Sequence, residues 1–168
     1  MARRLLLIRH AKAVAEASTD ARRELSPRGL RDAAAAGQWL FAHDLVPQHA
    51  LVSSARRARQ TWEAMAEQLG PGPATIIDER IYDNSVKQLL AVIRDAPSDA
   101  ETLALVGHNP SMHELAIDLD DGAGAGARRS DLLDAFPTAG IALLDVDGDW
   151  AALTLGDARL RDFHVARA

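Results

Sequence analysis

The sequence predicts an α/β fold, a three-layer α/β/α sandwich with a mostly parallel central sheet. Short, continuous apolar runs, which are typical of strands buried on both faces, alternate along the chain with segments of helical pattern. Strands that alternate with helices indicate an α/β domain. A length of 168 residues with 48% hydrophobic residues suits one globular domain, over residues 1–168, with a sizeable core.

The first half of the chain shows this alternation in order. The apolar run Arg4–Ile8 predicts the first buried strand. Ser26-Pro27 predicts a helix start, because serine is a good N-cap and proline fits the first helical position, and this helix should reach about His43. The next expected elements are a strand at Ala50–Ser53, a helix at Arg56–Leu69 that ends before Gly70-Pro71, and a strand at Thr75–Ile77.

The second half continues the pattern. The segment Ser85–Gln88 resembles a capping box and predicts a helix to about Asp95. The remaining expected elements are a buried strand at Thr102–Val106, a helix from Asn109-Pro110-Ser111 to about Leu119, a flexible glycine-alanine loop at 122–127, and a closing hairpin of Ile141–Val146 and Trp150–Leu155 around Asp147-Gly148.

Composition excludes several classes of function. A net charge of −5 argues against a nucleic-acid partner. With no cysteine, the chain has no disulfide, catalytic thiolate or cysteine-ligated zinc. The N-terminal apolar run is too short for a secretory signal, and no stretch approaches the roughly 20 apolar residues of a membrane span. We therefore expect no membrane partner, and a cytoplasmic location fits.

Polar residues follow three of the predicted strands. The first strand ends in Arg9-His10, the second runs into Ser53–Ala58 with its arginines, and the fourth ends in Gly107–Pro110, which contains His108. Ligands of an open parallel sheet bind at the carboxyl ends of its strands. Two histidines and at least two arginines are therefore expected to converge at one edge of the sheet.

This set of residues suits a phosphoryl group. An arginine fork matches phosphate oxygens and stays charged. A neutral imidazole can attack phosphorus when its other ring nitrogen donates to a backbone carbonyl, and a second, protonated histidine can donate to the equatorial oxygens. Each feature alone also fits a solvated loop, a solvated helix face or a capped turn. Their joint occurrence at strand ends favours the phosphoryl site.

The other four histidines lack a metal-ligand spacing and are expected at the surface or in packing; they are His43, His49, His113 and His164. The glycine-alanine segment lacks the Lys-Ser/Thr ending of a phosphate-binding P-loop. We therefore expect neither a metal nor a nucleotide site.

At this point the sequence resembles the histidine phosphatase superfamily, which is phosphoglycerate mutase-like in fold, and within it the SixA-type phosphohistidine phosphatase branch. Nearly the whole chain carries the resemblance, in five segments: Leu5–Lys12 with its Arg-His-Ala-Lys ending, Leu25–Gly29, Ser53–Thr61 with its Arg-Ala-Arg-Gln-Thr ending, Val106–Pro110, and Phe136–Gly140.

The resemblance implies a mechanism and a site. His10 would be the nucleophile that becomes phosphorylated, and Arg9, Arg57 and His108 would bind the phosphoryl group. No metal or cofactor is implied. The substrate would be a phosphorylated protein or a small phosphorylated metabolite.

Many members of this superfamily use a carboxyl group as general acid for the leaving group. Alignment on the apolar residue Ile81 puts Asp83 at that position, but Asp83 also fits a helix-entry residue just before Ser85, and both interpretations stay open. An alkoxide needs a proton as it leaves, whereas imidazole, with a pKa near neutrality, can leave already protonated. An uncertain acid position thus favours phosphohistidine substrates.

We therefore expect a metal-independent phosphatase that acts through a phosphohistidine enzyme intermediate, with phosphohistidine on a signalling or phosphotransfer protein as its substrate. The short linkers between the segments leave no room for a large cap, which suits a protein substrate. The alternatives are a phosphomonoesterase for a small metabolite and a non-catalytic phosphate-recognition module. A phosphoglycerate mutase fits less well, since the chain is short.

Overall fold

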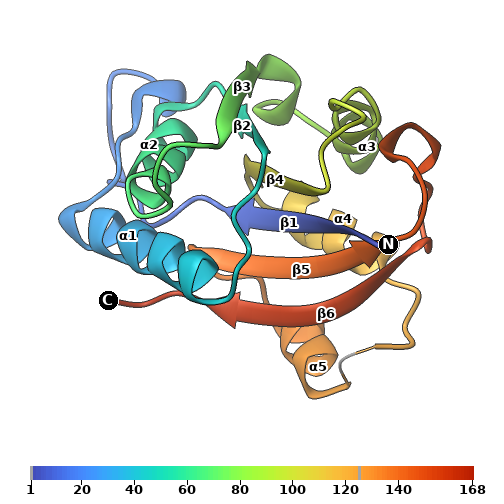
Figure 1. Cartoon of the computed structure of the whole chain (residues 1–168). Coiled ribbons are helices and arrows are strands. Elements are labelled where there is room, and N and C mark those ends of the chain that lie inside the picture. Colours follow the sequence, from blue (N-terminus) through green and yellow to red (C-terminus); the bar gives the residue numbers. More distant parts are fainter. Residues whose placement is uncertain (1, 125) are drawn as a thin grey trace.

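The computed structural model describes residues 2–124 and 126–168, and the described residues contain one six-stranded sheet (Figure 1). The strands are β1 (Arg3–Arg9), β2 (His49–Ser53), β3 (Ala74–Asp78), β4 (Thr102–Gly107), β5 (Gly140–Val146) and β6 (Ala158–Val165). They lie in the order β3-β2-β4-β1-β5-β6. The first four run parallel, whereas β5 is antiparallel to both of its neighbours.

Helices cover both faces of this sheet. On one face lie α1 (Pro27–Ala42) and α2 (Arg56–Ala66), and on the other lie α3 (Val86–Arg94), α4 (Ser111–Leu119) and α5 (Gly126–Asp134). The predicted three-layer α/β/α class with a mostly parallel sheet is confirmed. Among the described helices, none combines the length and apolar character that a membrane crossing needs.

Strand β1 shows why its sequence is apolar without alternation. Leu5 and Leu7 lie in the core that packs against α3, α4 and α5, whereas Leu6 and Ile8 lie in the core under α1 and α2. All four side chains are fully buried. A strand with a hydrophobic core on each side needs apolar residues at successive positions, because successive side chains point to opposite faces.

The expected helix starts are confirmed. Ser26 caps α1, since its side chain accepts a hydrogen bond from the Gly29 N–H at 3.1 Å, and Pro27 occupies the first helical position. Ser85 caps α3 in the same way, by accepting from the Gln88 N–H at 3.3 Å.

The expected strand at Trp150–Leu155 is wrong. Trp150–Ala152 forms a 3₁₀ turn, and the strand that pairs with β5 is β6, which begins only at Ala158. The apolar character of this segment has a different cause, because Trp150 is buried in the core and its Nε1–H donates to the Ala100 carbonyl at 2.8 Å.

The loop expected at 122–127 overlaps a helix that the sequence analysis did not predict. Helix α5 begins at Gly126 and buries Leu132 against the sheet. Ala125 lies outside the described residues.

Candidate active site

The register of two parallel strands brings two histidines together. Arg9 at the end of β1 lies opposite Gly107 at the end of β4, so the next residues, His10 and His108, leave the sheet side by side. The His10 N–H donates to the Gly107 carbonyl at 3.0 Å. The two rings lie 5.2 Å apart between centroids, and each residue is only 8% exposed. The expected convergence of strand ends thus holds for this pair.

The ring of His10 is oriented as a nucleophile requires. Its Nδ1 lies 2.7 Å from the Ala11 carbonyl oxygen, which can only accept, so the ring proton is on Nδ1. The lone pair is then on Nε2, for which the described residues provide no hydrogen-bond partner. The pKa of His10 is lowered to about 4. Burial makes the largest contribution, the hydrogen bond to Ala11 opposes it, and the positive charges of Arg57 and Arg9 add to the lowering. His10 is therefore neutral at pH 7.

His108 faces His10 and is held by Ser53. Its Nε2 lies 2.7 Å from the Ser53 Oγ, which also accepts the Ala55 N–H at 3.2 Å. A hydroxyl that donates to Nε2 leaves the proton of a neutral imidazole on Nδ1, and this buried atom has no partner among the described residues. Nδ1–H is then available to an oxyanion.

The imidazole of His108 is neutral at pH 7 in this arrangement. Burial makes the largest contribution, and the charges of His10 and Arg57 add to it, so that the pKa of His108 is lowered to about 3. The physical reason is that a second positive charge in a buried site that already holds arginines is unfavourable without an anion.

Two arginines complete the positive surroundings of His10. Arg9 donates through Nη1 to the Phe136 carbonyl at 3.1 Å, and burial lowers its pKa. Arg57, in the first turn of α2, is 6% exposed. The Nε atoms of both are buried without a partner among the described residues. Because buried polar groups are normally paired, these donors fit an anionic ligand. We call Arg9, His10, Ser53 and His108 the floor of the site.

Three residues that the sequence analysis did not identify form its rim; they are Asp20, Arg23 and Tyr82. The Asp20 Oδ2 accepts the Tyr82 hydroxyl at 2.6 Å, and Oδ1 accepts the Arg23 Nε–H at 3.0 Å. Arg57 joins rim to floor, because it donates to the Asp20 carbonyl at 2.9 Å and to Oδ2 at 3.1 Å. No local pattern marks Asp20, which lies 62 residues from Tyr82 along the chain.

Hydrogen bonds at the rim keep Asp20 ionised. The Tyr82 hydroxyl makes the largest contribution, with Arg23 and Arg57 adding to it, and together they lower the pKa of Asp20 to about 2. The positive charge of Arg23 also lowers the pKa values of both His10 and His108, which shows that this guanidinium is close to the floor.

Asp83 lies beside this network without joining it. Its side chain is exposed, and within the described part of the chain it forms no hydrogen bond or ion pair with the floor, with Arg57 or with the rim. Its charge contributes to raising the pKa of the adjacent Tyr82. Asp83 as general acid therefore stays a prediction.

The Gln-Thr pair that follows the arginines on α2 holds the loop after His10. The Thr61 Oγ1 accepts the Ala11 N–H at 3.0 Å and donates to the Arg57 carbonyl at 2.7 Å, so it ties the loop to the helix that carries the arginine. Gln60 accepts the Leu25 N–H at 2.7 Å. These bonds join the loop after His10 and the segment before α1 to helix α2.

A glycine lets helix α1 support the same loop. A Cβ atom on Gly29 would lie 2.0 Å from the Lys12 carbonyl oxygen, so only glycine allows the start of α1 to approach this backbone. Ser26 contributes as well, since its N–H donates to the same carbonyl at 2.9 Å.

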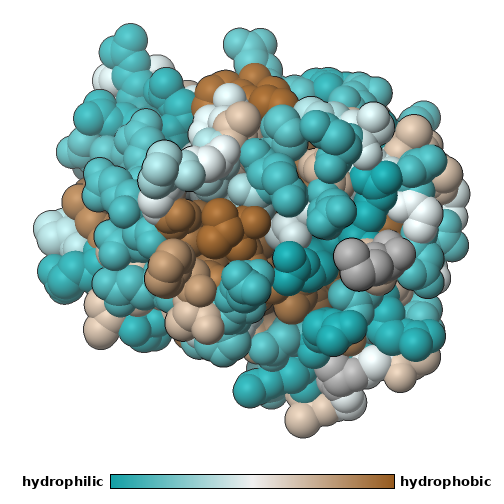
Figure 2. All heavy atoms as spheres, in the orientation of Figure 1, coloured by the Kyte–Doolittle hydropathy of each residue, from teal (hydrophilic) through white to brown (hydrophobic). Residues whose placement is uncertain are grey.

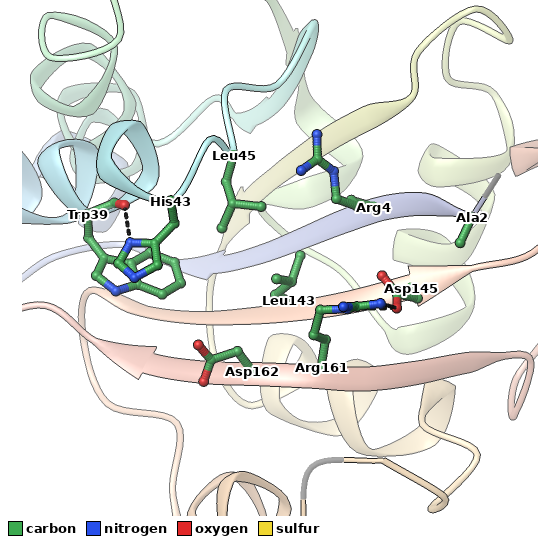
Figure 3. Close-up of a pocket in the computed structure, with 9 residues that line it drawn as sticks. All are labelled: Ala2, Arg4, Trp39, His43, Leu45, Leu143, Asp145, Arg161 and Asp162. Atoms are coloured by element: carbon green, nitrogen blue, oxygen red, sulfur yellow. Dashed lines mark hydrogen bonds and ion pairs between the residues drawn. The ribbon is translucent and has the colours of Figure 1, made fainter.

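The structure also contains a hollow that lies away from the floor and the rim. Its volume is about 560 Å³, and it lies on the α1 side of strands β1, β5 and β6, with Trp39, Leu143 and Arg161 among its lining (Figure 3). Figure 2 shows apolar side chains gathered on this face beside α1. None of the residues that line it belongs to the floor or the rim.

Two of the remaining four histidines pack against one tryptophan. The His164 ring stacks on Trp39 with ring centroids 4.4 Å apart, and the tilted His43 ring lies 4.5 Å from it. Within residues 2–124 and 126–168, no group of three or more His, Asp or Glu side chains is arranged to hold a metal ion.

Comparison with known proteins identifies the family. The model of the histidine phosphatase superfamily (branch 1) matches residues 5–89, which include His10, Ser53, Arg57 and Tyr82. The chain belongs to the histidine phosphatase superfamily. A relative from Mycobacterium tuberculosis, the uncharacterized protein Rv1276c, is 39% identical over 162 residues, which cover 95% of this chain and 100% of that protein.

Two solved structures place this histidine phosphatase near the SixA branch. A proposed phosphohistidine phosphatase SixA from Nakamurella multipartitia is 34% identical with a TM-score of 0.87, covering 100% of this chain and 98% of that one. A second one, from Agrobacterium tumefaciens, is 28% identical with a TM-score of 0.80, covering 98% of each chain. The protein is thus a phosphatase with a phosphoglycerate mutase-like fold, and its substrate is phosphorylated.

Proposed function

We propose that this phosphatase removes the phosphoryl group from phosphohistidine on a cytoplasmic signalling or phosphotransfer protein. In the proposed reaction, the lone pair of the His10 Nε2 attacks phosphorus and the bond to the leaving group breaks. Water then hydrolyses the phosphohistidine formed on His10. Arg9, Arg57 and the Nδ1–H of His108 bind the phosphoryl oxygens in both steps.

The low pKa of His10 supports this role. A nucleophilic imidazole must be neutral, and the pKa of about 4 keeps it so across the physiological range. The hydrogen bond from Nδ1 to the Ala11 carbonyl fixes the tautomer and turns Nε2 toward the site. Once phosphoryl oxygens bring negative charge, the pKa of His108 rises and its imidazole can donate as a cation.

The main support for the proposed substrate preference is that neither nearby carboxyl group, Asp20 or Asp83, is placed and protonated as a general acid. Asp20 has a pKa of about 2 and is ionised, so it cannot supply a proton at pH 7. Asp83 is exposed and forms no hydrogen bond or ion pair with the floor or with Arg57 among the described residues. A site with no acid held against its leaving group suits a substrate whose imidazole ring already carries its proton.

A second candidate is a phosphomonoesterase for a small phosphorylated metabolite. It is favoured by the position of Asp83, which directly follows the rim residue Tyr82 in the chain. A non-catalytic phosphate-recognition module is disfavoured because Arg9, His10, Arg57 and His108 are all present and grouped.

A panel of substrates tests the proposal. Initial rates should be compared on a histidine peptide phosphorylated with phosphoramidate, a phosphoserine peptide and p-nitrophenyl phosphate, each with wild type and His10→Ala. We expect the highest kcat/KM on the phosphohistidine peptide and no activity of the variant. A wild-type enzyme that hydrolyses the esters but leaves the phosphohistidine peptide intact would contradict the proposed substrate, and an active His10→Ala would contradict the mechanism.

A further inference from the structure

The rim carboxylate has no assigned task in the proposed mechanism. Asp20 does not bind the phosphoryl group, because two negative charges repel, and with a pKa of about 2 it is not a general acid. Yet three donors from different parts of the chain hold it: Arg57 on α2, Arg23 on the loop before α1, and Tyr82 after β3. These three donors fix the position of the Asp20 carboxylate at the edge of the site.

The position of Asp20 relative to the floor identifies what approaches it. His10 and His108 are 8% exposed, whereas the Asp20 side chain is 54% exposed. Attack by His10 from the floor is in line with the departing group, which therefore points outward, to the level of the rim. Asp20 lies near the floor, because Tyr82, whose hydroxyl donates to Asp20, packs edge-on against the His108 ring, with ring centroids 5.7 Å apart. A leaving group at the level of the rim would meet the exposed part of the Asp20 carboxylate.

We infer that Asp20 determines leaving-group specificity by accepting a hydrogen bond from the ring N–H of a protonated phosphohistidine. This inference rests on the proposed function and names the residue that selects its substrate. An anionic acceptor favours a cationic imidazolium ring and disfavours a phenolate or alkoxide, which develops negative charge as it leaves.

The step balances without another reactant. The His10 Nε2 lone pair forms the bond to phosphorus, the phosphorus–nitrogen bond of the substrate breaks, and its electron pair goes to the substrate ring nitrogen. The other ring nitrogen keeps its proton throughout, hydrogen-bonded to the carboxylate of Asp20, so the group leaves as neutral imidazole. The carboxylate stabilises the protonated ring, from which alone this neutral departure is possible.

Asp20→Asn tests the inference because it removes the charge and keeps the shape. The side-chain oxygen of asparagine can still accept from Tyr82. We expect kcat/KM on the phosphorylated histidine peptide to fall about tenfold or more, as for loss of a charged hydrogen bond, with p-nitrophenyl phosphate unchanged or faster. The matched control is Glu24→Gln, which removes a charge from the same loop, where Glu24 pairs with the exposed Arg56. It should leave both rates unchanged.

The pH profile of kcat adds a readout that a merely structural role would not change. Because Asp20 raises the pKa of the bound substrate ring, Asp20→Asn should shift the alkaline limb to lower pH for the phosphohistidine peptide only. Equal losses on both substrates would mean that Asp20 only holds Arg57, and equal gains would mean that it competes with phosphate for Arg57. Either result, or no change at all, overturns the inference while leaving the proposed function intact. If the wild-type protein does not hydrolyse the phosphohistidine peptide, the proposed function itself is contradicted.

Discussion

The floor and the rim of the site hold their titratable groups in opposite ways. On the floor, His10 and His108 are kept neutral mainly because burial penalises a charged ring. At the rim, Asp20 is kept charged mainly because hydrogen-bond donors surround an exposed carboxylate. The comparison teaches that desolvation lowers the pKa values of the floor imidazoles, whereas a hydrogen-bond network lowers the pKa of the rim carboxylate. Arg57 joins both, since it lowers the pKa of each histidine and of Asp20.

The largest expected effect comes from the floor. His10→Ala removes the nucleophile, and we expect activity on every phosphorylated substrate to fall by about 10⁴-fold or more. Wild type stopped in acid-free denaturant during turnover should carry a phosphoryl group on His10, which the variant cannot form. Mass spectrometry of the trapped protein checks this. Labelling at another residue in the wild type would show that the floor has been assigned wrongly.

Arg57→Ala disturbs floor and rim together, and its effect should be the next largest. Loss of a charged phosphate ligand is expected to reduce kcat/KM by about 10²–10³-fold. The protein should stay folded, as measured by urea unfolding. The control is Arg56→Ala, which removes the neighbouring, half-exposed arginine on the same helix turn. A collapse of stability in Arg57→Ala alone would instead assign this arginine a structural role.

The pH dependence of stability separates the floor from the rim. The pKa of a histidine is about 6.5 in the unfolded chain but about 4 for His10 and about 3 for His108, so the unfolded state binds more protons below pH 6.5. The free energy of unfolding should therefore fall as the pH drops from 6.5 toward 4, by on the order of 2 kcal/mol per histidine at pH 5. The pKa of Asp20 is lowered, so the stability that its ionised form contributes is lost only below about pH 4.

Urea unfolding at pH 7 and pH 5 measures this dependence, and His108→Gln should reduce it, because glutamine does not titrate. Imidazole signals in NMR spectra offer a direct check, since both rings should stay neutral at pH 5. A floor histidine that titrates near pH 6.5 would remove the basis of the comparison.

The smallest expected effect concerns the partner of His108. Ser53→Ala removes the hydroxyl that lies 2.7 Å from the His108 Nε2, and we expect kcat to fall about tenfold or less, as for loss of one neutral hydrogen bond. Ser54→Ala, one residue further along and without a side-chain bond to the site in the described structure, is the matched control. Equal rates for the two variants would show that Ser53 does not set the tautomer of His108.

Much of the floor could be predicted from the sequence, because its residues directly follow buried apolar strands. Arg9 and His10 follow β1 and His108 follows β4, and the carboxyl ends of parallel strands share an edge of the sheet. Arg57 could be found for a related reason, since it lies at the start of the helix after β2.

The rim could not be predicted in this way. Asp20 begins a three-residue 3₁₀ helix, Asp20–Arg22, and its contacts with Arg57 and Tyr82 span 37 and 62 residues. No periodicity, cap or turn signal marks such a residue, because its partners are decided by how loops fold over the finished sheet. The carboxyl group that the sequence predicts for the site is that of Asp83, the neighbour of Tyr82. Its role as general acid stays a prediction.

The sequence by itself determined the layers of this protein, its helix starts and the convergence of His10 and His108 at one edge of the sheet. Local patterns suffice there, because an apolar run, a capping serine or a polar residue after a strand has the same meaning in any α/β domain. Only the tertiary structure decided the strand order, the position of β6 after the buried Trp150, the neutral state of His108 and the rim around Asp20. These depend on burial and on contacts between distant segments, which exist only once the chain has folded.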